Sequence, residues 1–85
     1  MSEIEVGVVR HFFDRLDVAA VELTSGDLAV GDTLHIRGHT SDVTTRVDSI
    51  QLEQEKLTRA AKGQNVGIKI TGKVREHDRV FKVVP

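Results

Sequence analysis

The chain has 85 residues, of which 39% are hydrophobic and 29% charged, and its formal net charge is −1. This length allows one hydrophobic core, so we expect a single domain over residues 1–85, and the composition is too apolar for a disordered chain. The absence of cysteine excludes a disulfide framework and a thiolate metal cage.

Three strands are predicted in the first half of the chain. Residues 4–11 alternate in polarity, which predicts that Ile4, Val6 and Val8 point together into the core. Residues 18–23 resume this alternation, so the two segments form a hairpin. Turn clusters around the glycines at positions 26 and 31 then lead into a third strand at 33–37.

The second half predicts three more strands, at 43–54, 66–70 and 80–84. The apolar parity changes within the first of them, and a β-bulge near Asp48 and Ser49 would restore the register. The stretch Glu53 to Lys62 lacks an N-cap and is short, so we expect a loop with at most one helical turn. Six short strands at this spacing favour an all-β fold, a small closed six-stranded antiparallel β-barrel.

Two glycine-turn-strand units carry a resemblance to a known family, together with Val47, Ile50 and Asp78-x-Val80. The units read Gly26-x-Leu28-x-Val30-Gly31-Asp32-x-Leu34-x-Ile36 and Ala61-x-Gly63-x-Asn65-Val66-Gly67-Ile68. In this order the residues resemble the second, β-barrel domain of translational GTPases such as elongation factor Tu. The resemblance extends over roughly residues 6–84. It is closer still to stand-alone translation elongation factor-like proteins, and to the C-terminal barrel of collagenase-like peptidases.

The resemblance implies a binding role without GTPase activity. The chain has no Gly-x-x-x-x-Gly-Lys-Ser/Thr phosphate loop and no Asn-Lys-x-Asp motif, so we expect no bound nucleotide. In the family, the asparagine at the position of Asn65 lies by the aminoacyl end of tRNA, and Arg15 matches a basic residue of the first connection. The main prediction is therefore a non-catalytic module of translation or RNA processing that contacts tRNA or the ribosome. In the alternative reading, Asn65 is a turn residue that satisfies nearby backbone groups.

Charge is unevenly distributed along the sequence. Residues 1–61 hold six Lys or Arg against eleven carboxylates, a balance of −5, and residues 62–85 hold six against two, a balance of +4. A basic surface in the last third, suited to RNA phosphates, would include Lys69, Lys73, Arg75 and Arg79. Alternatively, these cations lie on solvated faces, paired with acids from the first half.

Phe12 and Phe13 are adjacent aromatic residues in the connection between the first two strands. They could form a stacking platform for a base, a docking knob for a protein, or a lid over one end of the barrel. The docking knob supports the second functional hypothesis, a protein-interaction module that docks onto a separate enzyme or GTPase.

The remaining chemistry of the sequence is sparse. His35 and His39 flank Arg37-Gly38, but a zinc site would need two further ligands, such as His11 or Asp42, and nothing in the spacing demands one. No nucleophile–base–acid arrangement can be assembled, so we expect no enzymatic activity, metal or cofactor. No apolar run approaches the roughly 20 residues that span a bilayer and the N-terminus lacks a secretory leader, so we expect a cytoplasmic protein without membrane contact.

Overall fold

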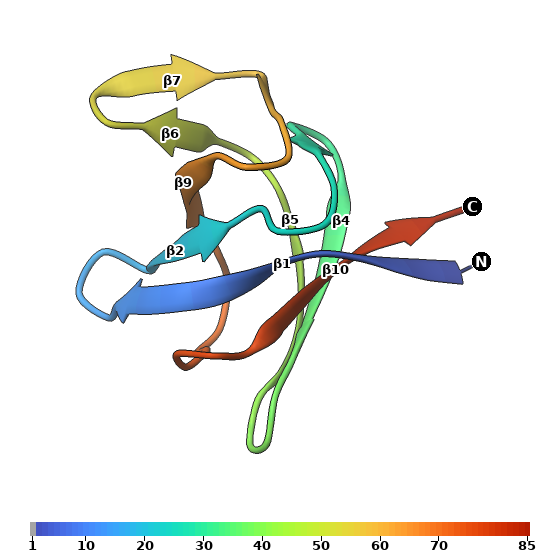
Figure 1. The fold of residues 1–85 in the computed structure, drawn as a ribbon. Helices are drawn as coiled ribbons and strands as arrows, with labels where there is room; N and C mark the ends of the chain where they lie inside the picture. The colour runs from blue at the N-terminus through green and yellow to red at the C-terminus, as the bar shows by residue number, and fades with distance from the viewer. Residues whose placement is uncertain (1) are drawn as a thin grey trace.

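The computed structural model describes residues 2–85, and in this range it contains strands and turns but no helix. The all-β class predicted from the sequence is confirmed (Figure 1). No helix in the described range is long or apolar enough to cross a membrane. The strands are β1 (Ser2–Phe13), β2 (Val18–Glu22), β3 (Leu28–Ala29), β4 (Thr33–Arg37), β5 (Asp42–Arg46), β6 (Ile50–Leu52), β7 (Glu55–Leu57), β8 (Arg59–Ala60), β9 (Asn65–Lys69) and β10 (Arg79–Val84).

The strands form one curved antiparallel sheet of eight strands, in the order β5-β4-β10-β1-β2-β9-β6-β7, and a separate pair, β3-β8. The prediction of a closed six-stranded barrel is wrong, because no ladder within residues 2–85 joins the edge strands. The β5 edge is instead covered by irregular chain: the Thr71 amide donates to Thr45 Oγ1 at 3.2 Å, and Gly72 packs against Val43. Side-chain contacts from Thr45 and Val43 thus stand where a further strand would form backbone hydrogen bonds with β5.

A bulge in β1 changes the predicted inward face of the first strand. Glu5 pairs with Phe81 and Gly7 with Val80, so Val6 is an extra residue that shifts the register by one. Val6 and Val9 are consequently buried, whereas Ile4 is 50% exposed. Of the three residues predicted to point into the core, Val6 does so, and the prediction is wrong for Ile4 and Val8.

The predicted long strand at 43–54 is two strands, β5 and β6, separated by residues 47–49. Val47 leaves the sheet to bond with the turn before β4: its amide donates to the Asp32 carbonyl at 2.9 Å and its carbonyl accepts from Gly31 N at 2.8 Å. The change of parity thus reflects a break in the strand, not a bulge at Asp48 and Ser49. The predicted loop at 53–62 contains β7, which pairs with β6, and β8, which pairs with β3.

The core is built from aliphatic side chains on the concave side of the sheet. Its fully buried large residues are Leu23, Leu28, Leu34, Ile36, Ile50, Ile68, Val6, Val9, Val21, Val47 and Val80. Phe12 is only partly buried against this cluster. Because Ser2 pairs with Val84, both ends of the described chain lie on neighbouring strands, and β1 runs from there to the opposite end of the molecule (Figure 1).

Candidate functional site

Exposed apolar side chains gather at the end of the β1–β2 hairpin. The chain turns there with a hydrogen bond from Leu16 N to Phe13 O (3.0 Å) and with Asp17 at a positive φ of 54°. Phe13 is 45% exposed and Leu16 64% exposed. The Phe13 ring is fixed by an edge contact with the His11 ring, with centroids 4.5 Å apart. Burying such surface is favourable, so this hairpin end is suited to contact another molecule.

A groove runs beside the hairpin end over the outer face of β2, β9 and β6. The strand register places Ala20 beside Gly67, and Gly67 beside Gln51. Because Ala20 and Gly67 have small side chains or none, they form the floor of a depression between larger neighbours. Two pockets share Gln51 and Gly67 as lining residues, one of about 420 Å³ that also includes Phe13, and one of about 320 Å³ that also includes Leu16. We refer to these two pockets together as the β2–β9 groove.

The structure brings three of the sequence-predicted site residues to this groove. Phe13 and Asn65 line the larger pocket, and Lys69 lines the smaller one. Asn65 is the first residue of β9, and the side chain that satisfies the preceding turn is that of Gln64, whose Oε1 accepts from Ala61 N at 2.7 Å. The turn role considered for Asn65 thus belongs to its neighbour.

The other predicted residues lie on the far side of the hairpin end or away from it. Arg15 lines a third pocket together with Phe12 and Phe13. Lys73 and Arg75 line a fourth with Phe12, and the Lys73 ammonium lies 5.8 Å from the Phe12 ring centroid. Phe12 and Phe13 share the third pocket, whereas only Phe12 lines the fourth and only Phe13 lines the groove. Arg79, at the start of β10, is not at these pockets and pairs with Glu5 at 3.3 Å.

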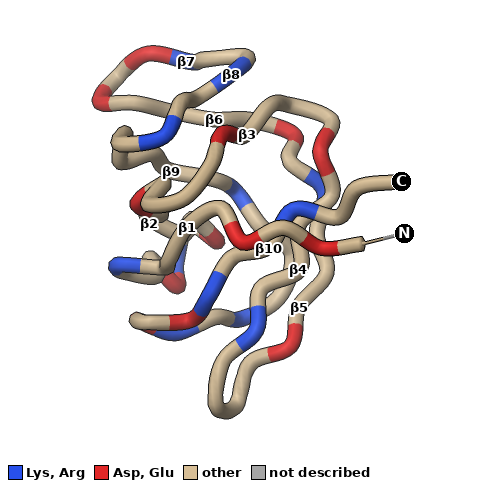
Figure 2. The backbone as a smooth tube through the Cα atoms, turned by 45° about the vertical axis from the view of Figure 1, so that its right-hand side comes forward, with Lys and Arg blue, Asp and Glu red and all other residues tan. Residues whose placement is uncertain are grey.

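Ion pairs neutralise much of the basic surface expected from the last third of the chain. Lys73 pairs with Asp14, Arg79 with Glu5, and Lys82 with Asp27 at 3.1 Å. These acids all come from the first half of the sequence. Figure 2 accordingly shows acidic and basic positions interspersed along the backbone. Such a surface lacks the concentrated positive charge that binds nucleic-acid phosphates.

Sequence reasoning missed the residues that shape the groove, namely Leu16, Ala20, Gln51 and Gly67. A signal was present at Gly67, because a glycine inside a strand often marks a site where a ligand or another backbone approaches closely. Whether it faces a groove depends on the long-range pairing of β9 with β2 and β6, which local patterns do not encode.

Within residues 2–85, no group of three His, Cys, Asp or Glu side chains is placed to hold a metal ion. Both ring nitrogens of His35 contact carboxylates instead, Glu3 at 2.8 Å and Asp42 at 2.5 Å.

This fold defines the class of the protein: a small antiparallel β domain of the barrel type, with an apolar hairpin end beside a groove. The chain belongs to the family described as elongation factor Tu domain 2, whose model matches residues 17–80. The family resemblance predicted from the two glycine-turn-strand units is thereby confirmed.

The chain is similar to segments of a curated protease and a curated collagenase. The chain is 41% identical over 80 residues to an uncharacterized protease of Methanocaldococcus jannaschii and 37% identical over 82 residues to a collagenase of Porphyromonas gingivalis. These alignments cover 93% and 95% of the chain but 19% and 20% of the relatives. The chain thus spans about one fifth of the length of the curated relatives it matches.

A solved structure shares the fold. The C-terminal domain of a candidate U32 peptidase from Geobacillus thermoleovorans superimposes with a TM-score of 0.86 at 20% identity, covering 93% of this chain and 91% of that one. Its selenomethionine variant gives a TM-score of 0.83 at 19% identity, covering 91% and 96%. The predicted likeness to the C-terminal barrel of collagenase-like peptidases is confirmed.

The comparisons overturn the main functional prediction. A role in translation or RNA processing, with contact to tRNA or the ribosome, is wrong, because the relatives are a protease and collagenases. The charges agree in part: of the four cations on which RNA contact depended, Lys73 is paired with Asp14 and Arg79 with Glu5.

Proposed function

We propose that this chain is a non-catalytic protein-interaction domain that docks onto the peptidase portion of a U32-family protein. The observation that carries the proposal is the pair of exposed side chains, Phe13 and Leu16, beside the β2–β9 groove. Support for the identity of the partner comes from the relatives, in which a matching segment forms about a fifth of a protease or collagenase chain.

The groove supports binding of a protein surface better than catalysis. Its lining residues include no histidine or cysteine, so the pockets offer no imidazole base or thiol nucleophile. Phe13 supplies the kind of large aromatic side chain that dominates binding energy at protein interfaces. The Asn65 amide, at the wall of the larger pocket, supplies donors and an acceptor for a polypeptide backbone.

Charge at the rim of the groove indicates the chemistry of the partner surface. Lys56 and Lys69 line the smaller pocket. Neither forms an ion pair with another residue of the described range. Complementary charge steers association and suppresses wrong partners. The docking face of the peptidase portion is therefore expected to present an apolar centre with acidic side chains on the side of Lys56 and Lys69.

The proposal is tested by titrating the ¹⁵N-labelled chain with the peptidase portion of a U32-family protein from the same organism. We expect amide signals of Phe13, Leu16, Asn65 and Gly67 to shift or broaden, because these residues form the contact. Signals of β5, on the other edge of the sheet, should stay in place. Unchanged spectra at saturating peptidase concentration, or changes confined to β4 and β5, would overturn the proposal.

A further inference from the structure

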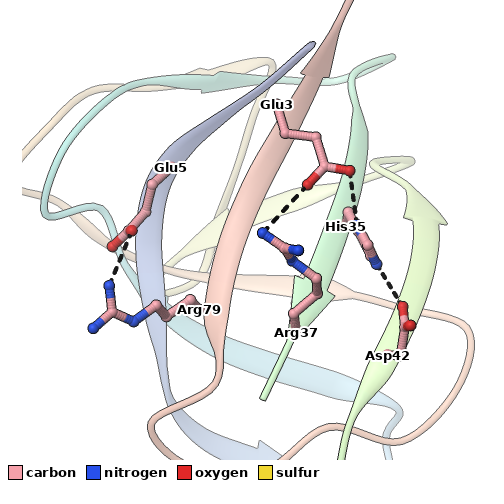
Figure 3. A network of polar contacts seen from close by, with 6 residues as sticks. All are labelled: Glu3, Glu5, His35, Arg37, Asp42 and Arg79. Carbon is pink, nitrogen blue, oxygen red and sulfur yellow. Dashed lines mark hydrogen bonds and ion pairs between the residues drawn. The ribbon is translucent and has the colours of Figure 1, made fainter. Parts of the chain in front are cut away.

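His35 is held between two carboxylates from different strands. Its Nδ1 lies 2.8 Å from Glu3 Oε2 on β1, and its Nε2 lies 2.5 Å from Asp42 Oδ1 on the edge strand β5 (Figure 3). The His35 side chain is 18% exposed, so solvent reaches the ring only in part. The imidazole thus connects β1 with β5 across the outer face of the sheet.

With both carboxylates ionised, this geometry requires the doubly protonated ring. A neutral imidazole carries one N–H, whereas an imidazolium donates from both nitrogens. With a neutral ring, one carboxylate oxygen would face a nitrogen lone pair at hydrogen-bond distance, which is repulsive. The arrangement in the structure therefore belongs to the charged form of His35.

The surrounding charges favour the same form. The titratable and charged groups of this face come from all four neighbouring strands (Figure 3). The connected network consists of Glu3 and Glu5 of β1, Arg37 of β4, Asp42 of β5 and Arg79 of β10. Arg46 of β5 lies on the same face but pairs with Asp48 at 3.9 Å, outside this network. Three carboxylates face two guanidinium groups, so a charged His35 makes the network neutral and a neutral one leaves it with an excess negative charge.

Glu3 and Asp42 differ in the partners left to them when the ring loses a proton. Glu3 Oε1 already lies 3.8 Å from Arg37 Nη2, and Arg37 is held in place by stacking over the Phe81 ring at 4.4 Å. Asp42 contacts no cation besides His35 in the described part of the chain. Glu3 can therefore turn to Arg37, which it already contacts. Asp42 is the cross-strand partner of Arg37 in the β4–β5 ladder but forms no ion pair with it, so Asp42 keeps the remaining N–H.

We propose that His35 is a proton-operated clamp that fastens the N-terminal end of β1 to β4 and β5 when protonated, and releases Glu3 to Arg37 when neutral. In the neutral state the ring keeps its Nε2–H toward Asp42. The backbone ladder of β1 with β10 remains, but the first residues of β1 lose their side-chain link across the sheet.

The hydrogen bonds with Asp42, and next with Glu3, raise the pKa of His35 above its ordinary value of about 6.5. A raised pKa in the folded state means that the clamp contributes fully below pH about 6.5, the value in the unfolded chain, and is lost as the pH rises through the folded value. The N-terminal end of β1 is thus most firmly held in mildly acidic solution.

The proposal is tested by following the ¹⁵N shifts of the His35 ring through a pH titration of the chain. We expect a midpoint above 6.5 and, on the alkaline side, a ring protonated at Nε2 and bare at Nδ1. A midpoint at the ordinary value, or a ring protonated at Nδ1 above the midpoint, would overturn the proposal. The protection factor of the Ile4 amide, which is the intrinsic exchange rate divided by the measured rate at each pH, should also fall across the same midpoint.

Three variants separate the clamp from general surface charge. Asp42→Asn and Glu3→Gln should each lower the His35 midpoint, and the Asp42 change should lower it more. The matched control is Glu5→Gln, which removes a carboxylate of the same face that pairs with Arg79 and not with His35. Equal midpoints for Glu3→Gln and Glu5→Gln would refute a specific link between Glu3 and His35.

Discussion

Asp27 joins three distant segments through one carboxylate. Its Oδ2 accepts from Arg59 at 2.8 Å, and its Oδ1 from Lys82 at 3.1 Å. Arg59 belongs to β8 and Lys82 to β10, so the residue before β3 fastens the small β3–β8 pair to the main sheet. The hydrogen bond from Arg59, followed by that from Lys82, lowers the pKa of Asp27 from 3.8 to about 2.

The Asp27 pairing predicts an acid-dependent contribution to stability. Because the folded pKa is lowered, the contribution is complete above pH 3.8 and is lost as the pH falls toward about 2. A ¹³C titration of the Asp27 carboxyl carbon should show the low midpoint, and Arg59→Gln should raise it. The matched control is Arg46→Gln, since Arg46 pairs with Asp48 and not with Asp27. An Asp27 midpoint near 3.8 in the unmodified chain would contradict the pairing.

At the scale of elements, β1 organises the molecule through its bulges. Each bulge lets the strand bend, so that β1 pairs with β10 over its first half and with β2 over its second. The bend also brings Gly7 close to β2: a Cβ added there would lie 2.3 Å from the Glu22 carbonyl oxygen. Only glycine allows this approach.

Two glycine substitutions test this account of the sheet. Gly7→Ala should lower the free energy of unfolding by about 1–3 kcal/mol, because the added methyl group collides with backbone. Gly67→Ala is the control: its Cβ would lie 3.4 Å from Val18 Cγ1, an ordinary contact. Alanine is better tolerated than glycine in strands, so that variant should be unchanged or up to about 1 kcal/mol more stable. Urea denaturation distinguishes the two, and equal losses would contradict the close approach at Gly7.

The alternation of polar and apolar residues predicted strands correctly where strand pairing is regular. It failed where a bulge or a break interrupts the pairing. The strand predicted at 33–37 is β4, and its alternating apolar residues Leu34 and Ile36 are buried, because β4 pairs without interruption on both sides. Ile4 was assigned to the wrong side, because a bulge is set by the partner strand and not by the sequence alone. The break at Val47 likewise depends on a distant turn at Gly31 and Asp32.

At the scale of the whole molecule, the sequence led to the correct family but to the wrong main function. Phe13 and Asn65 were selected as separate candidates, and their meeting in one pocket results from the order β1-β2-β9 in the sheet. The charge count of the last third suggested RNA, yet pairing across the fold cancels part of this charge, as for Lys82 with Asp27. Ion pairs between distant segments depend on the tertiary structure, so a count of charges along the sequence cannot predict them.

Docking at the β2–β9 groove is the central claim, and the affinity of the chain for the peptidase portion of a U32-family protein tests it most directly. We predict that Phe13→Ala weakens binding by roughly 30-fold, the effect of about 2 kcal/mol at an aromatic hot spot. Gly67→Ala, which raises the groove floor, should weaken it without loss of stability. Ile4→Ala removes an equally exposed apolar side chain outside the groove and should leave the dissociation constant unchanged. Equal affinities for Phe13→Ala and Ile4→Ala, measured by calorimetry, would contradict the claim.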